Sequence, residues 1–291
     1  IHTHHLWIVT ALARSTVREI PVVTSCHGTC LRQHHLCPDT SRMIIDDLKR
    51  IDRVIALSRD QQKQISDLLG FAPEKVPVIS GGYNAQCFFH QPKEFEGTVE
   101  LVYAGKLSVV KGVPWLLKSL EKIRHLPFRL HMAGSSSGPE KDFCLSLADQ
   151  FGDKVIYHGP LSHEKLGELM RKSHVFILPS FFEGMPLVLI EALACGCRII
   201  ATALPGVKEL FHTGHSEMVR LIDLPELETI DRPYKKDEPA LEVLLSQAVE
   251  QAVKDAINNF RPDQSYVKQV RACYTWENIF SKIEKVYQDL I

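Results

Sequence analysis

The sequence has no long hydrophobic run, no dense set of cysteines and almost no net charge. Its 34 Lys and Arg residues balance 35 Asp and Glu residues, for a formal net charge of -1. That balance argues against a broad nucleic-acid-binding surface. No apolar run approaches the roughly 20 residues that a membrane-spanning helix needs. Eight cysteines in 291 residues are too few for a disulfide framework, which indicates reduced thiols and a cytoplasmic protein.

A starting methionine and a recognisable signal peptide are also missing, since the sequence starts at Ile1. Apolar residues, in contrast, are plentiful. The sequence is 45% hydrophobic and 24% charged, which is enough for two ordinary domains with real cores.

Short apolar runs alternate with helical stretches, which is typical of parallel sheets covered by helices. Three strand-like runs precede a polar stretch at residues 91–97, which we interpret as a linker, and six follow it. The first three are Pro21–Ser25, Arg53–Leu57 and Lys75–Ile79. The later six are Val99–Ala104, Phe128–Met132, Lys154–Tyr157, Val175–Leu178, Arg198–Ala201 and Met218–Ile222. Six strands can make a complete doubly wound domain.

Residues 179–197 carry the strongest functional signal, because two carboxylates flank a helix start there. Pro186 suits the first helical position, with Glu183 in the preceding loop and Glu191 about a turn and a half into the helix. The N–H groups of this helix start would bind an anion such as a diphosphate, and Glu191 would reach a hydroxyl attached to it. Spacing alone allows an ordinary strand–loop–helix unit with solvent-facing glutamates equally well. The N–H groups concerned are those around Met185, Leu187 and Val188.

A pair of lysines follows the first strand of the second series. That strand ends at Gly105, and Lys106 and Lys111 flank the turn into a helix that begins near Val113. In an open parallel sheet the carboxyl ends of strands face the ligand, so the two ammonium groups would hold a diphosphate and stabilise it as it leaves. Two solvated surface lysines are the alternative. The loop 134–138, after another expected strand, could contact phosphate or ribose, or could be plainly flexible.

The two segments together resemble the retaining GT-B glycosyltransferases of family 4, also called glycosyl transferases group 1. Residues 105–112 are similar to the family's G-R-x-x-x-x-K-G segment, with Lys106 where arginine is more usual. The E-x7-E signature is matched by Glu183 and Glu191, and the resemblance covers nearly the whole chain. Further matching residues are Gly184, Leu187, Ala192, Gly196, Thr202, Pro205, Gly206, Glu209 and Leu210.

This resemblance implies an α/β GT-B fold of two Rossmann-like doubly wound domains that face a cleft. The N-terminal, acceptor-side domain would span 1–92 and be incomplete, the nucleotide-sugar-binding domain would span 97–274, and a helix at 275–291 would cross back. Family members open with a glycine-rich loop after their first strand, and none occurs before His2. We therefore expect a fragment that lacks on the order of one hundred N-terminal residues.

The resemblance also implies a reaction, in which a sugar passes from a nucleotide-diphosphate sugar to a hydroxyl acceptor with retention. The expected catalytic residues are Glu183, His27 and Lys111, with Glu191 on the ribose. No metal or other cofactor is expected beyond the donor substrate, and the acceptor would be a sugar, lipid or glycan, with no nucleic acid. Peripheral membrane association through the missing N-terminal part stays open. The expected donor-binding residues are Gly105, Lys106, Lys111, Gly184, Met185, Leu187, Val188 and Glu191.

Two other functions remain as alternatives to sugar transfer. A GT-B sugar-nucleotide epimerase would share the fold and need no acceptor. A non-catalytic sugar-nucleotide-binding paralogue would be favoured by loss of Glu183 or Lys111, and both are present.

Histidines and cysteines near the start of the chain suggest a competing metal site. The triplet His2-x-His4-His5 resembles the H-x-H of metal-dependent hydrolases, whose imidazoles bind zinc. The spacing of the neighbouring ligands matches no closed Cys/His pattern. Those neighbours are Cys26, His27, Cys30, His34, His35 and Cys37.

His27 has a second interpretation, from the resembled family. There, a strand that ends in T-x-H places a histidine beside the transferred sugar, and Thr24–His27 matches it after a one-residue offset. The alternative is a histidine that caps a buried turn. Arg32 is a weaker acceptor-side candidate. Arg59 could approach a phosphate, although helix capping by Ser58 explains that segment equally well.

Overall fold

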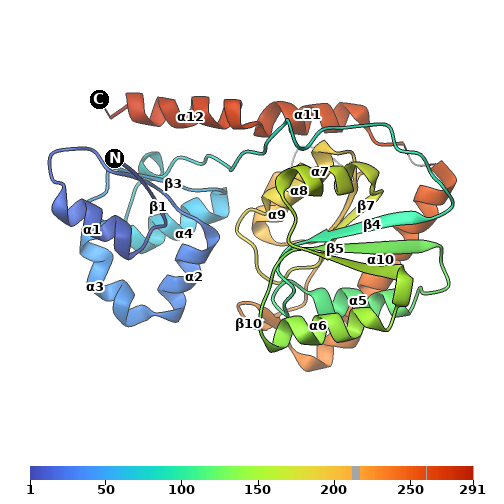
Figure 1. The fold of residues 1–291 in the computed structure, drawn as a ribbon. Coiled ribbons are helices and arrows are strands. Elements are labelled where there is room, and N and C mark those ends of the chain that lie inside the picture. The colour runs from blue at the N-terminus through green and yellow to red at the C-terminus, as the bar shows by residue number, and fades with distance from the viewer. Residues whose placement is uncertain (212–216, 260, 291) are drawn as a thin grey trace. The chain divides into compact units, whose positions relative to one another are not determined.

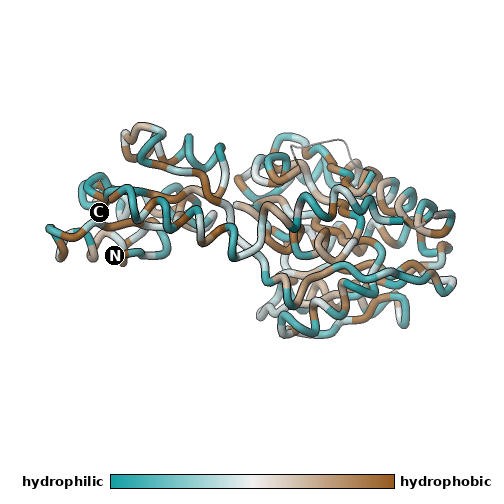
Figure 2. Tube along the Cα trace, turned by 90° about the horizontal axis from the view of Figure 1, so that it is seen from above, coloured by the Kyte–Doolittle hydropathy of each residue, from teal (hydrophilic) through white to brown (hydrophobic). Residues whose placement is uncertain are grey.

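The computed structural model describes residues 1–211, 217–259 and 261–290, which form two compact units. The first unit comprises Ile1–Gly82, Glu183–Pro186 and Tyr274–Ile291, and the second comprises Tyr83–Phe182 and Leu187–Cys273. The first boundary therefore lies between Gly82 and Tyr83, earlier than the expected end at residue 92. Hydrophobic and hydrophilic segments alternate along the chain in both units (Figure 2), as expected of elements that bury one face.

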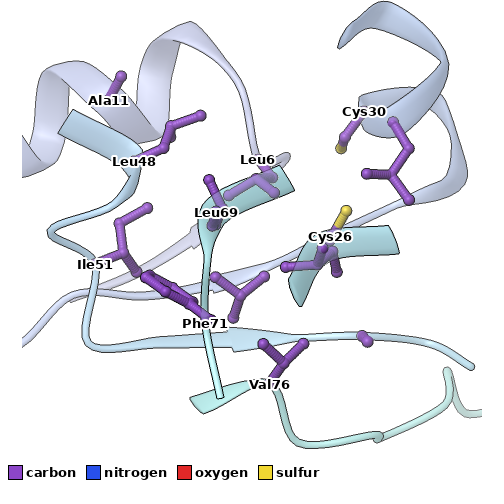
Figure 3. Close-up of a cluster of buried hydrophobic side chains, with 13 residues drawn as sticks. Leu6, Ala11, Cys26, Cys30, Leu48, Ile51, Leu69, Phe71 and Val76 are labelled. Atoms are coloured by element: carbon purple, nitrogen blue, oxygen red, sulfur yellow. The ribbon is translucent and has the colours of Figure 1, made fainter. Parts of the chain in front are cut away.

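The first unit is built on a three-stranded parallel sheet in the order β1-β2-β3. Its core consists of thirteen buried hydrophobic side chains from the strands and the helices around them (Figure 3). Its strands are β1 (His2–His4), β2 (Val23–Ser25) and β3 (Arg53–Ile55). Its helices are α1 (Ile8–Thr16), α2 (Gly28–Leu36), α3 (Pro38–Leu48), α4 (Arg59–Leu69), the 3-10 turn η1 (Pro73–Lys75) and α12 (Trp276–Gln288).

The helix α12 packs on the sheet of the first unit although it is remote in sequence. Ile279 and Val286 are buried in one cluster with Val23, Ile55 and Ile79. Not all of its apolar positions are used, because the side chain of Phe280 is 59% exposed. The association still assigns the end of the chain to the unit that contains its beginning (Figure 1).

One predicted strand of the first unit, Lys75–Ile79, is wrong. The structure has only an isolated bridge between Ala56 and Val78 there, preceded by the 3-10 turn η1. Pro77 has no N–H to donate to a ladder. The bridge consists of two hydrogen bonds. The N–H of Ala56 donates to the carbonyl of Pro77 at 3.0 Å, and the N–H of Ile79 donates to the carbonyl of Ala56 at 2.9 Å.

The second unit contains a six-stranded, all-parallel sheet in the order β6-β5-β4-β7-β8-β9. Every strand predicted for this unit is present, with small shifts at the ends, and the hairpin β10–β11 was not predicted. The sheet strands are β4 (Val99–Ala104), β5 (Phe128–Ala133), β6 (Val155–Gly159), β7 (Val175–Leu178), β8 (Arg198–Thr202) and β9 (Val219–Ile222). The hairpin consists of β10 (Leu227–Thr229) and β11 (Arg232–Pro233).

Helices cover both faces of this sheet, with α5, α6 and α10 on one side and α7 and α8 on the other (Figure 1). The helices are α5 (Val113–Glu121), α6 (Pro139–Asp149), α7 (His163–Lys172), α8 (Leu187–Ala194), α9 (Pro205–Leu210), α10 (Glu238–Asn259) and α11 (Gln264–Tyr274), with 3-10 turns η2 (Gly152–Lys154) and η3 (Lys235–Asp237). In the described part of the chain, none of the helices has the length and apolarity to cross a membrane.

The strand order places the switch point of the sheet between β4 and β7. From β4 the chain moves outward through β5 and β6, then returns to the other side of β4 and moves outward through β7, β8 and β9. Ligands of doubly wound sheets bind outside the carboxyl ends of the strands at such a point. The loops that leave β4 and β7 are therefore the first place to look for a site.

Candidate functional site

The loop after β4 is locked onto the end of β7 by a glycine. Gly112 is left-handed, with φ of 70°, and a Cβ on it would lie 2.0 Å from the carbonyl oxygen of Pro179. Only glycine meets both the conformation and the approach. Because Lys111 precedes Gly112 directly, the backbone of the lysine sits at the switch point.

Further contacts join the two loops. The N–H of Phe181 donates to the carbonyl of Val110 at 2.9 Å. The rings of Trp115 and Phe181 meet edge to face with their centroids 4.8 Å apart, and the hydroxyl of Thr202 donates to the carbonyl of Ser180. The loop after β4 and the first residues after β7 are thus held together within the second unit.

The start of the lysine loop is fixed in the same way. The hydroxyl of Tyr103 donates to the carbonyl of Lys106 at 2.6 Å. Gly134, with φ of 139°, packs so closely that a Cβ on it would lie 1.9 Å from the carbonyl oxygen of Gly105. The loop 134–138 therefore packs on the lysine loop at its first residue, whereas Gly138 has open space around it.

Glu140 supports the lysine loop and was missed by the sequence analysis. It lies in the first turn of α6, and its Oε2 accepts a hydrogen bond from the N–H of Val109 at 3.1 Å. Its other oxygen is 3.9 Å from the guanidinium of Arg232. An acidic residue in a first helical turn is commonplace, so no local signal distinguishes it from Asp142 beside it.

Both lysines lie on this supported loop. The side chain of Lys106 is exposed and that of Lys111 is half-buried. The positive end of α5 follows at Val113, so the loop combines two ammonium groups with a helix dipole. This combination suits a polyanion.

The helix α8 brings a single ionisable residue into an otherwise apolar sequence. Leu187 and Val188 form its first turn, one residue later than Pro186, the predicted start. Burial raises the pKa of the Glu191 carboxyl to about 7, while the nearby His163 lowers it by a smaller amount. Because an isolated buried charge is costly, the one half-buried carboxyl of this apolar helix is a candidate hydrogen-bond acceptor for a ligand.

Three other predicted residues, Glu183, Gly184 and Met185, fall in the first unit. There Gly184 lies against Gly28: a Cβ on Gly28 would come within 2.9 Å of the Cα of Gly184. Two glycines are needed for this approach. It places the loop that carries Glu183 next to the residue that follows His27.

His27 occupies the N-cap position of α2 but makes no side-chain cap bond. Its Nε2 is instead 3.2 Å from Nδ1 of His4. Burial lowers the pKa of His27, and the charges of His5 and His4 lower it further. A neutral imidazole at neutral pH is the consequence.

The neighbouring candidates have structural partners. His2 contacts Ser25 and Tyr287, and His34 contacts Ser41 and the carbonyl of Leu6. Within the described ranges, no group of three or more His, Cys, Asp or Glu side chains is arranged to hold a metal ion.

The two arginine candidates lie on helices of the first unit. Arg59 is exposed at the first residue of α4, where the hydroxyl of Ser58 accepts a hydrogen bond from the N–H of Gln61 at 3.1 Å. Helix capping thus accounts for the segment around Arg59. Arg32 lies half-buried on α2.

Two protein-family models match this chain, one after the other. A model described as Glycosyltransferase Family 4 matches residues 1–86, and one described as Glycosyl transferases group 1 matches residues 86–219. The chain belongs to the glycosyl transferases group 1 family, of the family 4 type.

Two relatives of this chain have names that point to different acceptors. It is 23% identical over 256 residues to the phosphatidylinositol N-acetylglucosaminyltransferase gpi3 subunit of Schizosaccharomyces pombe, covering 86% of this chain and 52% of the relative. It is 28% identical over 247 residues to D-inositol 3-phosphate glycosyltransferase 1 of Catenulispora acidiphila, covering 74% and 58%. The chain therefore spans little more than half the length of these relatives.

Solved structures show the fold of the glycosyltransferase. Sucrose-phosphate synthase from Thermosynechococcus elongatus superposes with a TM-score of 0.77 at 21% identity, covering all of this chain and 73% of that one. The Anabaena protein HepE in complex with UDP and glucose superposes with a TM-score of 0.76 at 18% identity, covering 97% and 75%. The α/β GT-B fold with two Rossmann-like domains, predicted above, is confirmed.

Proposed function

We propose that this glycosyltransferase transfers a sugar from a nucleoside-diphosphate sugar to a hydroxyl acceptor, with retention at the anomeric carbon. The observation that carries the proposal is the lysine loop, which Gly112 and the Phe181 to Val110 hydrogen bond fix at the switch point of the sheet. HepE, which shares the fold, has been solved with UDP, with UDP and glucose, and with UDP-glucose. Retention rests on the family resemblance.

In this proposal the chain neutralises the leaving group with its own charges. Lys106 and Lys111 bind the diphosphate, and the first-turn N–H groups of α8 add a helix dipole. As the bond to the sugar breaks, negative charge grows on the diphosphate, and preorganised cations stabilise it more than they stabilise the bound donor. No divalent cation is then needed for this step.

The remaining residues have roles at the two ends of the donor. Glu191 accepts a hydrogen bond from the ribose. Glu183 binds hydroxyls of the sugar near the reacting carbon, and His27 orients that sugar. We propose a cytoplasmic setting because the eight cysteines, all within the described residues, form no disulfide. Peripheral membrane association stays a prediction.

Calorimetry on this chain tests the donor site directly. We expect one of uridine, guanosine or adenosine diphosphate to bind with a dissociation constant between micromolar and millimolar, roughly -8 to -4 kcal/mol. Lys111→Ala should weaken binding about tenfold or more, because a charge-assisted bond contributes about 1.5–3 kcal/mol. Lys118→Ala, which removes a lysine of α5 that pairs with Glu238 and Glu242, is the matched control. No binding of any of the three by the folded chain would refute the site.

The roles of the two glutamates separate in transfer kinetics. Glu191→Ala should raise the KM for donor with a smaller loss of kcat, because the ribose bond is present in ground and transition states alike. Glu183→Ala should lower kcat more than it raises KM. The opposite pattern would exchange the two assignments.

Metal independence has its own test. A chelator should leave the transfer rate within about twofold, since the lysines carry the positive charge. Elemental analysis that finds one tightly held zinc per chain, lost together with activity, would instead restore the metal-dependent alternative.

A further inference from the structure

The first unit contains two cysteines whose sulfur atoms face each other in its core. Cys26 directly follows β2, and Cys30 is the third residue of α2. Both side chains are fully buried, and their sulfur atoms point toward one another (Figure 3). The Cys26 thiol donates a hydrogen bond to the carbonyl of His27 at 3.7 Å, and each thiol shifts the pKa of the other. The glycosyl-transfer proposal uses neither of them.

A strained histidine lies against this pair. His5 has φ of 73°. Among the described residues, it is the only one other than glycine with a positive φ. Left-handed backbone is uncommon for a side-chain-bearing residue, costs of order 1–3 kcal/mol and concentrates at functional sites. Here the conformation is held by hydrogen bonds to the His5 carbonyl from Trp7 N–H at 2.8 Å and the Thr10 hydroxyl at 2.6 Å. Its result is that Nδ1 of His5 is 3.6 Å from Sγ of Cys30.

The surroundings shift the pKa values of the two thiols in opposite directions. The hydrogen bond from Cys26 lowers the pKa of Cys30 to about 6, against the effect of burial, and the bond to His5 lowers it further. The same hydrogen bond, together with burial, raises the pKa of Cys26 well above its ordinary value. Cys30 also sits at the positive end of α2, which favours a thiolate. One thiolate beside one protonated thiol is the arrangement of an attacking and a resolving cysteine.

We propose that Cys30 and Cys26 form a peroxide-reactive pair that closes to a reversible disulfide, with His5 as its positioning residue. The Cys30 sulfur attacks hydrogen peroxide, so that an S–O bond forms, the O–O bond breaks and hydroxide leaves. The Cys26 sulfur then attacks the sulfenic sulfur of Cys30, so that the S–S bond forms and the S–O bond breaks. Its thiol proton and the departing hydroxide make water. In sum, two thiols and one peroxide give one disulfide and two waters, and a dithiol such as dithiothreitol reverses the change.

Peptide mapping can follow this reaction on the wild-type chain. Trypsin releases residues 19–32 as one peptide that contains both cysteines and no other. After peroxide treatment at pH 6, this peptide should be two hydrogens lighter and resist alkylation, until dithiothreitol restores both. The folded chain should react roughly tenfold faster than the chain in urea, because an ordinary thiol is under about 1% ionised at that pH. Equal rates would show that proximity in sequence alone makes the bond.

Variants separate the roles of the three residues. His5→Asn keeps a side chain that tolerates left-handed backbone but removes the imidazole, and it should slow closure about threefold or more and move its pH midpoint upward. Cys26→Ser should leave a sulfenic acid on Cys30 that a 1,3-dione traps. Cys144→Ser, which removes a buried thiol of the second unit, should change nothing. A dione adduct on Cys26 in Cys30→Ser, or full alkylation of residues 19–32 after peroxide, would overturn the proposal. None of these readouts requires sugar transfer.

Discussion

The buried carboxyl of Glu191, the proposed ribose acceptor, destabilises the fold when it is ionised. Its carboxyl is the only ionisable group in the apolar helix α8, and burial raises its pKa to about 7 from 4.5. The folded protein therefore binds this proton more tightly than the unfolded chain does. Stability must fall as pH rises from about 4.5 through about 7, and it levels off above that range.

We accordingly predict that Glu191→Gln stabilises the protein at pH 8 by about 1–3 kcal/mol, because the amide never has to ionise. The gain should vanish near pH 4, where the carboxyl is protonated in both states. Urea unfolding of both proteins at the two pH values measures it. Donor affinity should fall at the same time if Glu191 accepts from ribose. A variant that is less stable at pH 8 would contradict the pKa assignment.

Gly112 allows the steric part of the site to be isolated. We predict that Gly112→Ala destabilises the second unit by about 3 kcal/mol or more and abolishes nucleoside diphosphate binding, since a Cβ would lie 2.0 Å from Pro179 O. Gly159→Ala is the matched control in the same unit, because Gly159 also has φ of 70° but nothing within 4 Å of its Cβ position. Its cost should be only about 1 kcal/mol. If thermal unfolding showed equal losses of stability in Gly112→Ala and Gly159→Ala, the left-handed backbone alone, and not the contact with Pro179, would account for the glycine at position 112.

At the scale of elements, α6 acts on the lysine loop through one carboxylate. We predict that Glu140→Ala weakens nucleoside diphosphate binding about threefold to tenfold, because the N–H of Val109 loses its acceptor. Glu140→Gln, which still offers an oxygen, should stay within about twofold. Asp142→Ala removes a second first-turn carboxylate of α6 and controls for the helix dipole. Calorimetry on the three variants compares them, and a loss in Asp142→Ala equal to that in Glu140→Ala would remove Glu140 from the site.

The elements that the sequence predicted are those encoded by local pattern. Apolar runs such as Val175–Leu178 give strands because both faces of a parallel sheet are covered, and the run becomes wholly buried. The same criterion failed at Lys75–Ile79, where Pro77 interrupts the ladder and a bridge at Val78 is all that forms. In that stretch Val76 and Ile79 are buried but Val78 is exposed, and Pro77 has no N–H for the hydrogen bonds of a strand.

The residues of the candidate site also differ in whether a local sequence pattern identifies them. Lys111 and Glu191 belong to motifs of fixed spacing and were found from sequence, although their chemical roles stay predictions. Glu140 reaches a residue 31 positions away, and the contact of Gly134 with Gly105 also joins distant loops. Such pairings depend on the order of strands in the sheet, which no local pattern contains. Cys26 and Cys30 were named from sequence only as possible metal ligands, and neither their approach to each other nor the left-handed backbone of His5 was predicted.

At the scale of the whole molecule, the two units have separate cores, and the proposed diphosphate cradle of Lys106 and Lys111 belongs to only one of them. Multidomain chains commonly unfold in more than one step, and a ligand stabilises the unit that binds it. The three tryptophans report on the units separately, because Trp115 lies in the second unit and the other two, Trp7 and Trp276, lie in the first.

We therefore predict that nucleoside diphosphate shifts the unfolding transition seen by Trp115 and not the one seen by the other tryptophans. A variant with Trp7→Phe and Trp276→Phe leaves Trp115 as the only fluorophore, and Trp115→Phe leaves the other two. At one hundred times the dissociation constant the ligand should add about 2.7 kcal/mol to the free energy of unfolding of the second unit. Trp115 packs on Phe181 in the loop after β7, so Lys111→Ala in the same background should cancel the shift. A shift confined to the Trp7 and Trp276 signal would move the diphosphate site to the first unit and refute the assignment of the lysines.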